Sequence, residues 1–256
     1  MGAFVLSSRL SSFSLVSLLL AFGFGLFLFV LPFMAYDLSS SVFMVGIVIA
    51  VPALVSLLAA VPAGDFAVVH GVRYSSVAGL FVMAFAALCL SYSSSLPTFL
   101  LSVCLLSAAY QLVYTSLKVH LLDISPSGAS SKYFSVLAAS FQLGLALGPV
   151  AGGFLMLGGF GGGVALTLRL FSLDCLTLMF LFFVFGTGDK RAGGVHRAVK
   201  KGFAVSVMEY LKLGCVGVLV FWLTVLFTSY EGLVWAFEPL FSRYYDMSPL
   251  AAGVIL

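Results

Sequence analysis

Charged residues are the component that this sequence lacks most, since they make up only 8% of its 256 residues. A soluble domain carries roughly a quarter charged residues, because its surface must face water. Hydrophobic residues account for 62% of the chain, and the mean hydropathy is +1.20. The shortage of charge excludes an ordinary soluble fold and indicates a surface that mostly faces lipid.

The sequence also lacks the patterns of metal sites, disulfide frameworks and intramembrane enzymes. Its four cysteines lie far apart, without a C-x-x-C pair or a nearby histidine. Neither an H-E-x-x-H nor a D-D-x-x-D motif is present. His70, His120 and His196 fall in or beside segments that we expect on the cytoplasmic side, away from any membrane-embedded nucleophile. We expect no metal, no cofactor and no catalytic residue, and an intramembrane enzyme is the weaker alternative.

What the sequence does contain is a series of apolar runs, each close to the ~20 residues that cross a bilayer as a helix. We therefore predict an all-α polytopic membrane protein. Seven spans are expected at residues 14–35, 42–63, 75–90, 98–121, 133–157, 164–185 and 213–240, and an eighth begins near Ser248. The run after Arg9 is longer than the apolar core of a signal peptide, so we expect the first span to be retained.

A single long polar segment divides the chain. We predict a six-helix transmembrane bundle over residues 1–187, a basic cytoplasmic connector over residues 188–212, and an incomplete second bundle over residues 213–256.

The basic residues set the expected orientation. Nearly all of them fall on one side of the predicted spans: Arg9, Arg73, Lys118, Lys132 and the cluster from Lys190 to Lys212. Cytoplasmic loops carry such an excess of lysine and arginine. We therefore predict a cytoplasmic N-terminus in a protein of the cell (plasma) membrane. Its expected partners are the lipid bilayer, with anionic lipid beside the connector, and not nucleic acid.

The fifth span contains the most specific motif, Gly144-Leu-Ala-Leu-Gly148-Pro149-Val-Ala-Gly152-Gly153. Three of its glycines recur every fourth residue, so they share one helical face. In lipid, such small residues allow two helix backbones to approach closely. Pro149 removes one backbone hydrogen bond and should bend the helix.

This G-x-x-x-G-P-x-x-G-G string resembles the fifth-helix motif of the major facilitator superfamily, which is characteristic of its proton-linked exporters. The resemblance implies a major-facilitator-like N-terminal six-helix bundle plus the start of the second bundle. It also implies that the motif forms a rocking or sealing seam between the two halves, made by Gly144, Gly148, Pro149, Gly152 and Gly153.

The loop after the second span is similar to the G-x-x-x-D-R-x-G-R-R loop of the same family. Gly64, Gly71 and Arg73 occupy matching positions, whereas Val68 replaces the usual acidic residue and Asp65 could substitute for it.

A second loop adds a candidate partner for Arg73. Asp123, at the end of the fourth span, resembles the family's acidic residue that interacts with the loop after the second helix. The resemblance implies a cytoplasmic gate, and the alternative is a set of solvated loop charges.

Polar residues inside the spans are candidates for a substrate or proton pathway, because charges in hydrocarbon are costly. Glu231 in the seventh span could bind a cation or carry a coupling proton, or form a structural hydrogen bond. Asp174 lies near mid-depth in the sixth span, which is peripheral in the family. Tyr110, Gln111 and Tyr114 of the fourth span could contact substrate or satisfy one another. The fourth span lacks the embedded arginine of proton-linked exporters.

Together these features predict a secondary transporter that moves a small organic solute by alternating access, with proton-coupled efflux as one form. Its expected ligands are a small-molecule substrate and protons. The alternative is a truncated half that does not transport alone, because the eighth span is interrupted. A second copy or a missing C-terminal half would then complete it.

Overall fold

The computed structural model describes residues 2–125, 130–158, 160–185 and 248. The described residues contain helices and no strand: α1 (Gly2–Ser39), α2 (Val42–His70), α3 (Val72–Ser91), α4 (Leu96–Ile124), α5 (Ser130–Leu155), the short 3₁₀ helix η1 (Met156–Gly158) and α6 (Phe160–Phe185). Six of these are long and apolar enough to cross a membrane. The predicted all-α membrane fold is therefore confirmed. The expected connector, seventh and eighth spans lie outside the described residues.

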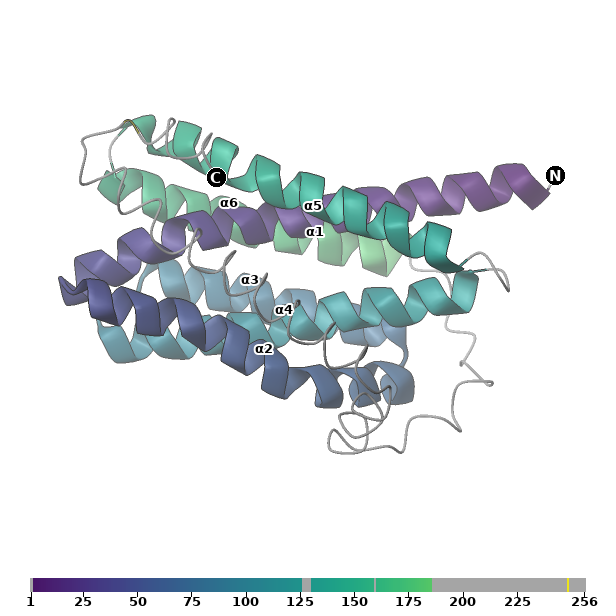
Figure 1. The fold of residues 1–256 in the computed structure, drawn as a ribbon, viewed down its shortest axis with the longest axis horizontal. Coiled ribbons are helices and arrows are strands. Elements are labelled where there is room, and N and C mark those ends of the chain that lie inside the picture. The colour runs from purple at the N-terminus through teal and green to yellow at the C-terminus, as the bar shows by residue number, and fades with distance from the viewer. Residues whose placement is uncertain (1, 126–129, 159, 186–247, 249–256) are drawn as a thin grey trace, which may run out of the picture.

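The helices form two groups of three (Figure 1). In the first group, α1 packs along α5 and also contacts α6; in the second, α4 packs against both α2 and α3. The contact of α3 with α6, and a smaller one of α1 with α2, join the groups. Phenylalanine side chains fill much of the interior, and among the described residues five are fully buried: Phe27, Phe29, Phe33, Phe99 and Phe171.

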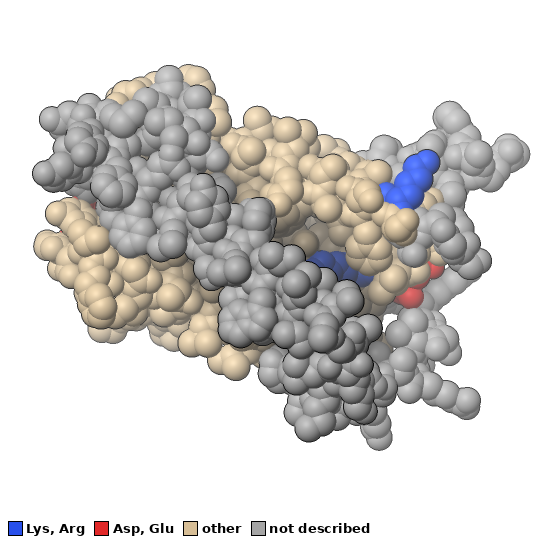
Figure 2. All heavy atoms as spheres, in the orientation of Figure 1, with Lys and Arg blue, Asp and Glu red and all other residues tan. Residues whose placement is uncertain are grey.

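The outer surface of the bundle is apolar as well. Large hydrophobic side chains such as Leu58, Leu101 and Phe180 are more than half exposed. On the face shown in Figure 2, uncharged side chains cover most of the described surface, and the charged ones gather towards the end where α1 begins. An apolar band with charges at its end is what a lipid environment requires.

Several hydroxyl groups inside the helices are satisfied within their own helix. Ser107, Ser116 and Thr167 each donate a hydrogen bond of 2.7 Å to the backbone carbonyl four residues earlier. Such bonds remove the cost of an unpaired hydroxyl in an apolar interior. These residues therefore fit the spans without a partner on another helix.

Candidate functional site

The glycine face of α5 lies against the backbone of α1. A Cβ atom on Gly148 would lie 2.6 Å from the carbonyl carbon of Gly25, and one on Gly25 would lie 2.6 Å from the carbonyl oxygen of Leu145. At Gly144 a Cβ would collide with the carbonyl oxygen of Leu18. Real Cβ atoms do not approach backbone this closely, so only glycine permits the observed spacing. We call this contact the α1–α5 seam.

Two serine contacts extend the seam towards the N-terminal end of α5. Ser140 donates to the carbonyl of Val136 at 2.8 Å, so in its hydrogen bond with Ser14 the proton comes from Ser14. Ser17 donates to the carbonyl of Leu137 at 3.3 Å. The seam therefore combines close backbone packing with interhelical hydrogen bonds.

The other motif residues also lie inside the bundle. A Cβ atom on Gly152 would lie 2.6 Å from the ring of Phe29 on α1, and both Pro149 and Gly153 are buried. The helix continues through Pro149 to Leu155. The motif thus joins two helices of the same bundle. The expected contact with a second half involves residues outside the described part of the chain and stays a prediction.

Aromatic rings connect α1, α4 and α5 across a region where α4 makes few contacts with the other two helices. Phe24 stacks on Tyr110 with ring centroids 3.8 Å apart and planes 8° apart. Tyr110 and Tyr114 are also parallel, at 5.8 Å and 8°. Tyr114 then meets Phe141 at 5.2 Å. We call these four residues the aromatic ladder.

Polar groups of α4 lie beside the ladder. The ammonium nitrogen of Lys118 is 4.0 Å from the ring centroid of Tyr114, a cation–π distance. Gln111 donates to the hydroxyl of Thr115 at 3.3 Å, and both side chains are half-buried. The structure therefore brings together Tyr110 and Tyr114, as their spacing indicates, but it also adds Phe24 and Phe141. No sequence pattern marks these two residues, because they lie on other helices.

The structure does not pair the charged residues that were expected to form the cytoplasmic gate. Arg73 donates a hydrogen bond to the backbone carbonyl of Phe183, and its guanidinium lies 5.4 Å from the centroid of that ring. Asp65 and Asp123 are exposed. Within the described ranges, no ion pair joins either carboxylate to Arg73. Arg73 instead places a positive charge at the C-terminal end of α6, where the helix dipole favours it.

The two glycines expected at the cytoplasmic gate, Gly64 within α2 and Gly71 after it, differ in what they require. Gly71 has a φ of 86°, a conformation that favours glycine, and it alone separates α2 from α3. At Gly64 a Cβ atom would meet only the methyl group of Thr115, at an ordinary 3.8 Å. Gly71 is therefore needed for the tight turn, whereas the position of Gly64 has room for a side chain.

Asp174 lies apart from the ladder, near the middle of α6. Its Oδ2 atom is buried and accepts no hydrogen bond from any residue that the structure describes. A Cβ atom on Gly23 of α1 would lie 2.5 Å from this oxygen. Arg169 is directed elsewhere, with its guanidinium 5.3 Å from the ring centroid of Tyr92.

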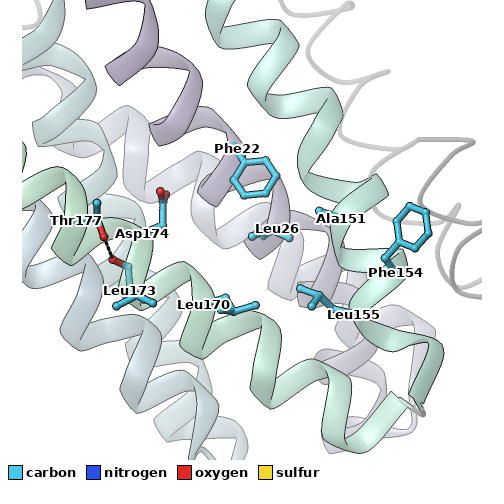
Figure 3. A pocket seen from close by; sticks show the side chains of 9 residues that line it. All are labelled: Phe22, Leu26, Ala151, Phe154, Leu155, Leu170, Leu173, Asp174 and Thr177. Carbon is cyan, nitrogen blue, oxygen red and sulfur yellow. Dashed lines mark hydrogen bonds between the residues drawn. The ribbon is translucent and has the colours of Figure 1, made fainter. Parts of the chain in front are cut away.

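An open cavity of about 510 Å³ adjoins Asp174 between α1, α5 and α6 (Figure 3). Its lining is Phe22, Leu26, Ala151, Phe154, Leu155, Leu170, Leu173, Asp174 and Thr177. The hydroxyl of Thr177 is already engaged, since it donates to the carbonyl of Leu173 at 2.9 Å. Among the described lining residues, the carboxyl group is thus the one ionisable group.

One turn of α1 connects these features. Gly23 faces Asp174 and Phe171 of α6, Phe24 stacks on Tyr110 of α4, and Gly25 lies against α5. Successive residues of an α-helix point about 100° apart, so three neighbours can face three different helices. We call residues 23–25 the junction turn.

Two further expectations concern the pathway and metals. Glu231, the predicted pathway carboxylate of the seventh span, lies outside the described residues. Over the ranges that the structure describes, no group of three histidine, cysteine, aspartate or glutamate side chains could hold a metal ion.

A comparison with protein families decides where this bundle belongs. The model of the Major Facilitator Superfamily matches residues 13–256, which is nearly the whole chain. The chain belongs to the major facilitator superfamily. Membership supports membrane transport rather than an enzymatic reaction, with lipid and a small molecule as the partners of this major facilitator. A comparison with curated proteins gave no match.

Proposed function

We propose that this major facilitator is a secondary active transporter that carries a small organic solute by alternating access. The observation that supports this most directly is the aromatic ladder. It spans the gap between α4 and the α1–α5 pair, where the helices themselves make few contacts. A solute that displaced the ladder rings could enter this gap without disrupting a close-packed helix interface.

The chemistry of the ladder suits an organic solute. Tyr114, Gln111 and Thr115 are half-buried, so they keep surface available for contact. Aromatic rings bury apolar surface and stack on planar groups, while hydroxyl and amide groups fix orientation. In the proposed mechanism, the solute contacts Tyr110, Gln111 and Tyr114 while Lys118 remains over the Tyr114 ring.

We assign the direction as efflux with proton coupling. The support is the resemblance of the fifth-helix motif to that of proton-linked exporters. Glu231 is the proposed proton carrier, because a carboxylate in the seventh span would be one of few ionisable groups within the membrane.

The proposed orientation has a cytoplasmic N-terminus. Arg73 lies at the start of α3, Lys118 near the end of α4 and Lys132 at the start of α5, so antiparallel helices bring all three to one end of the bundle. This is the end where α1 begins (Figure 1). An excess of basic residues at one end supports the cytoplasmic assignment, and we propose the plasma membrane as the location.

Counterflow in proteoliposomes tests transport by the full chain. Liposomes are preloaded in turn with an unlabelled amino acid, a hexose, a nucleoside or ethidium, and uptake of the same labelled compound is followed. We expect exchange above that of empty liposomes for at least one compound. Replacing Tyr114 by Leu should reduce it, whereas replacing the exposed Tyr92 by Leu should not. Equal exchange by both variants would contradict the assignment of the ladder.

A further inference from the structure

The carboxyl group of Asp174 poses an electrostatic problem that the described residues do not solve. Its Oδ2 atom is buried and has no hydrogen-bond donor among them. Near the middle of a membrane helix, an ionised and unpaired carboxylate is costly. The nearest basic residue along α6, Arg169, lies over the ring of Tyr92 instead. None of the residues that the structure describes therefore supplies a cation at this site.

The bundle nevertheless makes room for this group. The close approach of α1 depends on Gly23, where a Cβ atom would lie 2.5 Å from Oδ2 and 2.7 Å from the ring of Phe171. A larger residue at this position would displace the carboxyl group. The packing of α1 against α6 thus sets the position of the Asp174 carboxyl group. Asp174 is not a freely moving surface side chain.

The cavity beside Asp174 opens on the outside of the bundle. Phe154 and Leu173 on its rim are 58% exposed, and they belong to the apolar outer surface of the described helices, which we expect to face lipid. Figure 3 shows Phe22 and Leu26 of α1 directed towards the space between α5 and α6, with Asp174 to one side. The cavity therefore offers apolar walls with a single acidic group at its edge.

We propose that this cavity is a lipid-side binding site for a lipophilic organic cation. The apolar body of the ligand would pack against Phe22, Leu26 and Phe154, and its charge would pair with the carboxylate of Asp174. The charge complementarity is the argument for this occupant, since a neutral acyl chain would leave the carboxylate unpaired. The site is separate from the aromatic ladder, and the proposal requires binding but not transport.

Equilibrium binding of tritiated tetraphenylphosphonium tests the proposal. The full chain is reconstituted in phosphatidylcholine nanodiscs, and binding to empty nanodiscs is subtracted. We expect saturable binding that Asp174→Asn weakens by about tenfold or more, because it removes the charge while keeping the shape. Ala151→Phe should weaken binding as well, because it fills the cavity and leaves the carboxylate in place.

Asp123→Asn is the control, because it removes an exposed acidic residue and should leave the affinity unchanged. Tyr114→Leu tests the competing location of the cation, the aromatic ladder. Equal affinity of wild type and Asp174→Asn would overturn the proposal, as would binding no higher than to empty nanodiscs. Loss of binding in Tyr114→Leu alone would also overturn it, because the cation would then occupy the ladder. Size-exclusion profiles of all variants confirm that folding is retained.

Discussion

Gly148 of α5 lies directly against Gly25 of α1, so that a Cβ atom on Gly148 would come within 2.6 Å of the Gly25 carbonyl carbon. Neither helix can yield by rotating a side chain, because the atoms in contact belong to the backbone. The separation of α1 and α5 therefore depends on the absence of one methyl group.

The first prediction concerns this contact. Gly148→Ala should destabilise the protein by about 1–3 kcal/mol, because the added Cβ forces the two backbones apart. The measurement is thermal unfolding of the full chain in detergent. Gly46→Ala is the matched control, since the Cβ it would add meets no described atom within 4 Å apart from its own stretch of helix. Its stability should be unchanged or slightly raised through helix propensity. Equal losses in both variants would show that the seam is not tightly packed.

A second prediction concerns the hydrogen bond between Ser14 and Ser140. In a double-mutant cycle with Ser14→Ala and Ser140→Ala, we expect a coupling energy of about 0.6 kcal/mol, the typical value for interhelical hydrogen bonds in membranes. Chemical unfolding in detergent would measure it. Pairing Ser14→Ala with Ser135→Ala, whose hydroxyl bonds within α5 to the carbonyl of Ser131, should give no coupling.

The third prediction concerns the end of α6. Arg73→Gln removes the cation that donates to the carbonyl of Phe183, so amide hydrogen exchange should become faster in the last turn of α6. Arg73→Lys should restore only part of the protection, because an ammonium group lacks the planar guanidinium that stacks on Phe183. Lys132→Gln is the control for loss of a positive charge at the same end. Unchanged exchange in Arg73→Gln would show that the contact does not hold the helix end.

A fourth prediction separates the charge of Lys118 from the ring of Tyr114. In counterflow, Lys118→Met should weaken solute exchange about fivefold, because a half-buried cation–π contact contributes on the order of 1 kcal/mol. Tyr114→Phe, which keeps the ring, should stay close to wild type. If Tyr114→Phe lost as much activity as Tyr114→Leu, the hydroxyl group and not the ring face would be the important contact.

The transmembrane bundle could be predicted from sequence because lipid imposes helices of a minimum length on apolar runs. The predicted ends were less accurate. The second span was expected to finish at Ala63, but α2 continues to His70, past Pro62 and Asp65. Hydropathy marks where hydrocarbon ends and not where a helix ends.

The contacts between helices were harder to predict. The four-residue spacing of Tyr110 and Tyr114 indicated a shared face, which their parallel rings agree with. The stacking of Phe24 on Tyr110 depends on how α1 is rotated, and no local pattern encodes that rotation. The contact of Arg73 with Phe183 is equally hard to predict from sequence, because its acceptor is a backbone carbonyl that any residue could supply.

The junction turn has a consequence for how variants of this protein are interpreted. Its three residues contact α6, α4 and α5 respectively, and they share one rigid stretch of backbone. A shift or rotation of α1 at this level therefore changes the distance to Asp174, the overlap with Tyr110 and the fit against Gly148 at the same time. Substituting Gly23 or Gly25 would disturb three neighbours rather than one, so the function of each is better isolated by mutating the opposite helix.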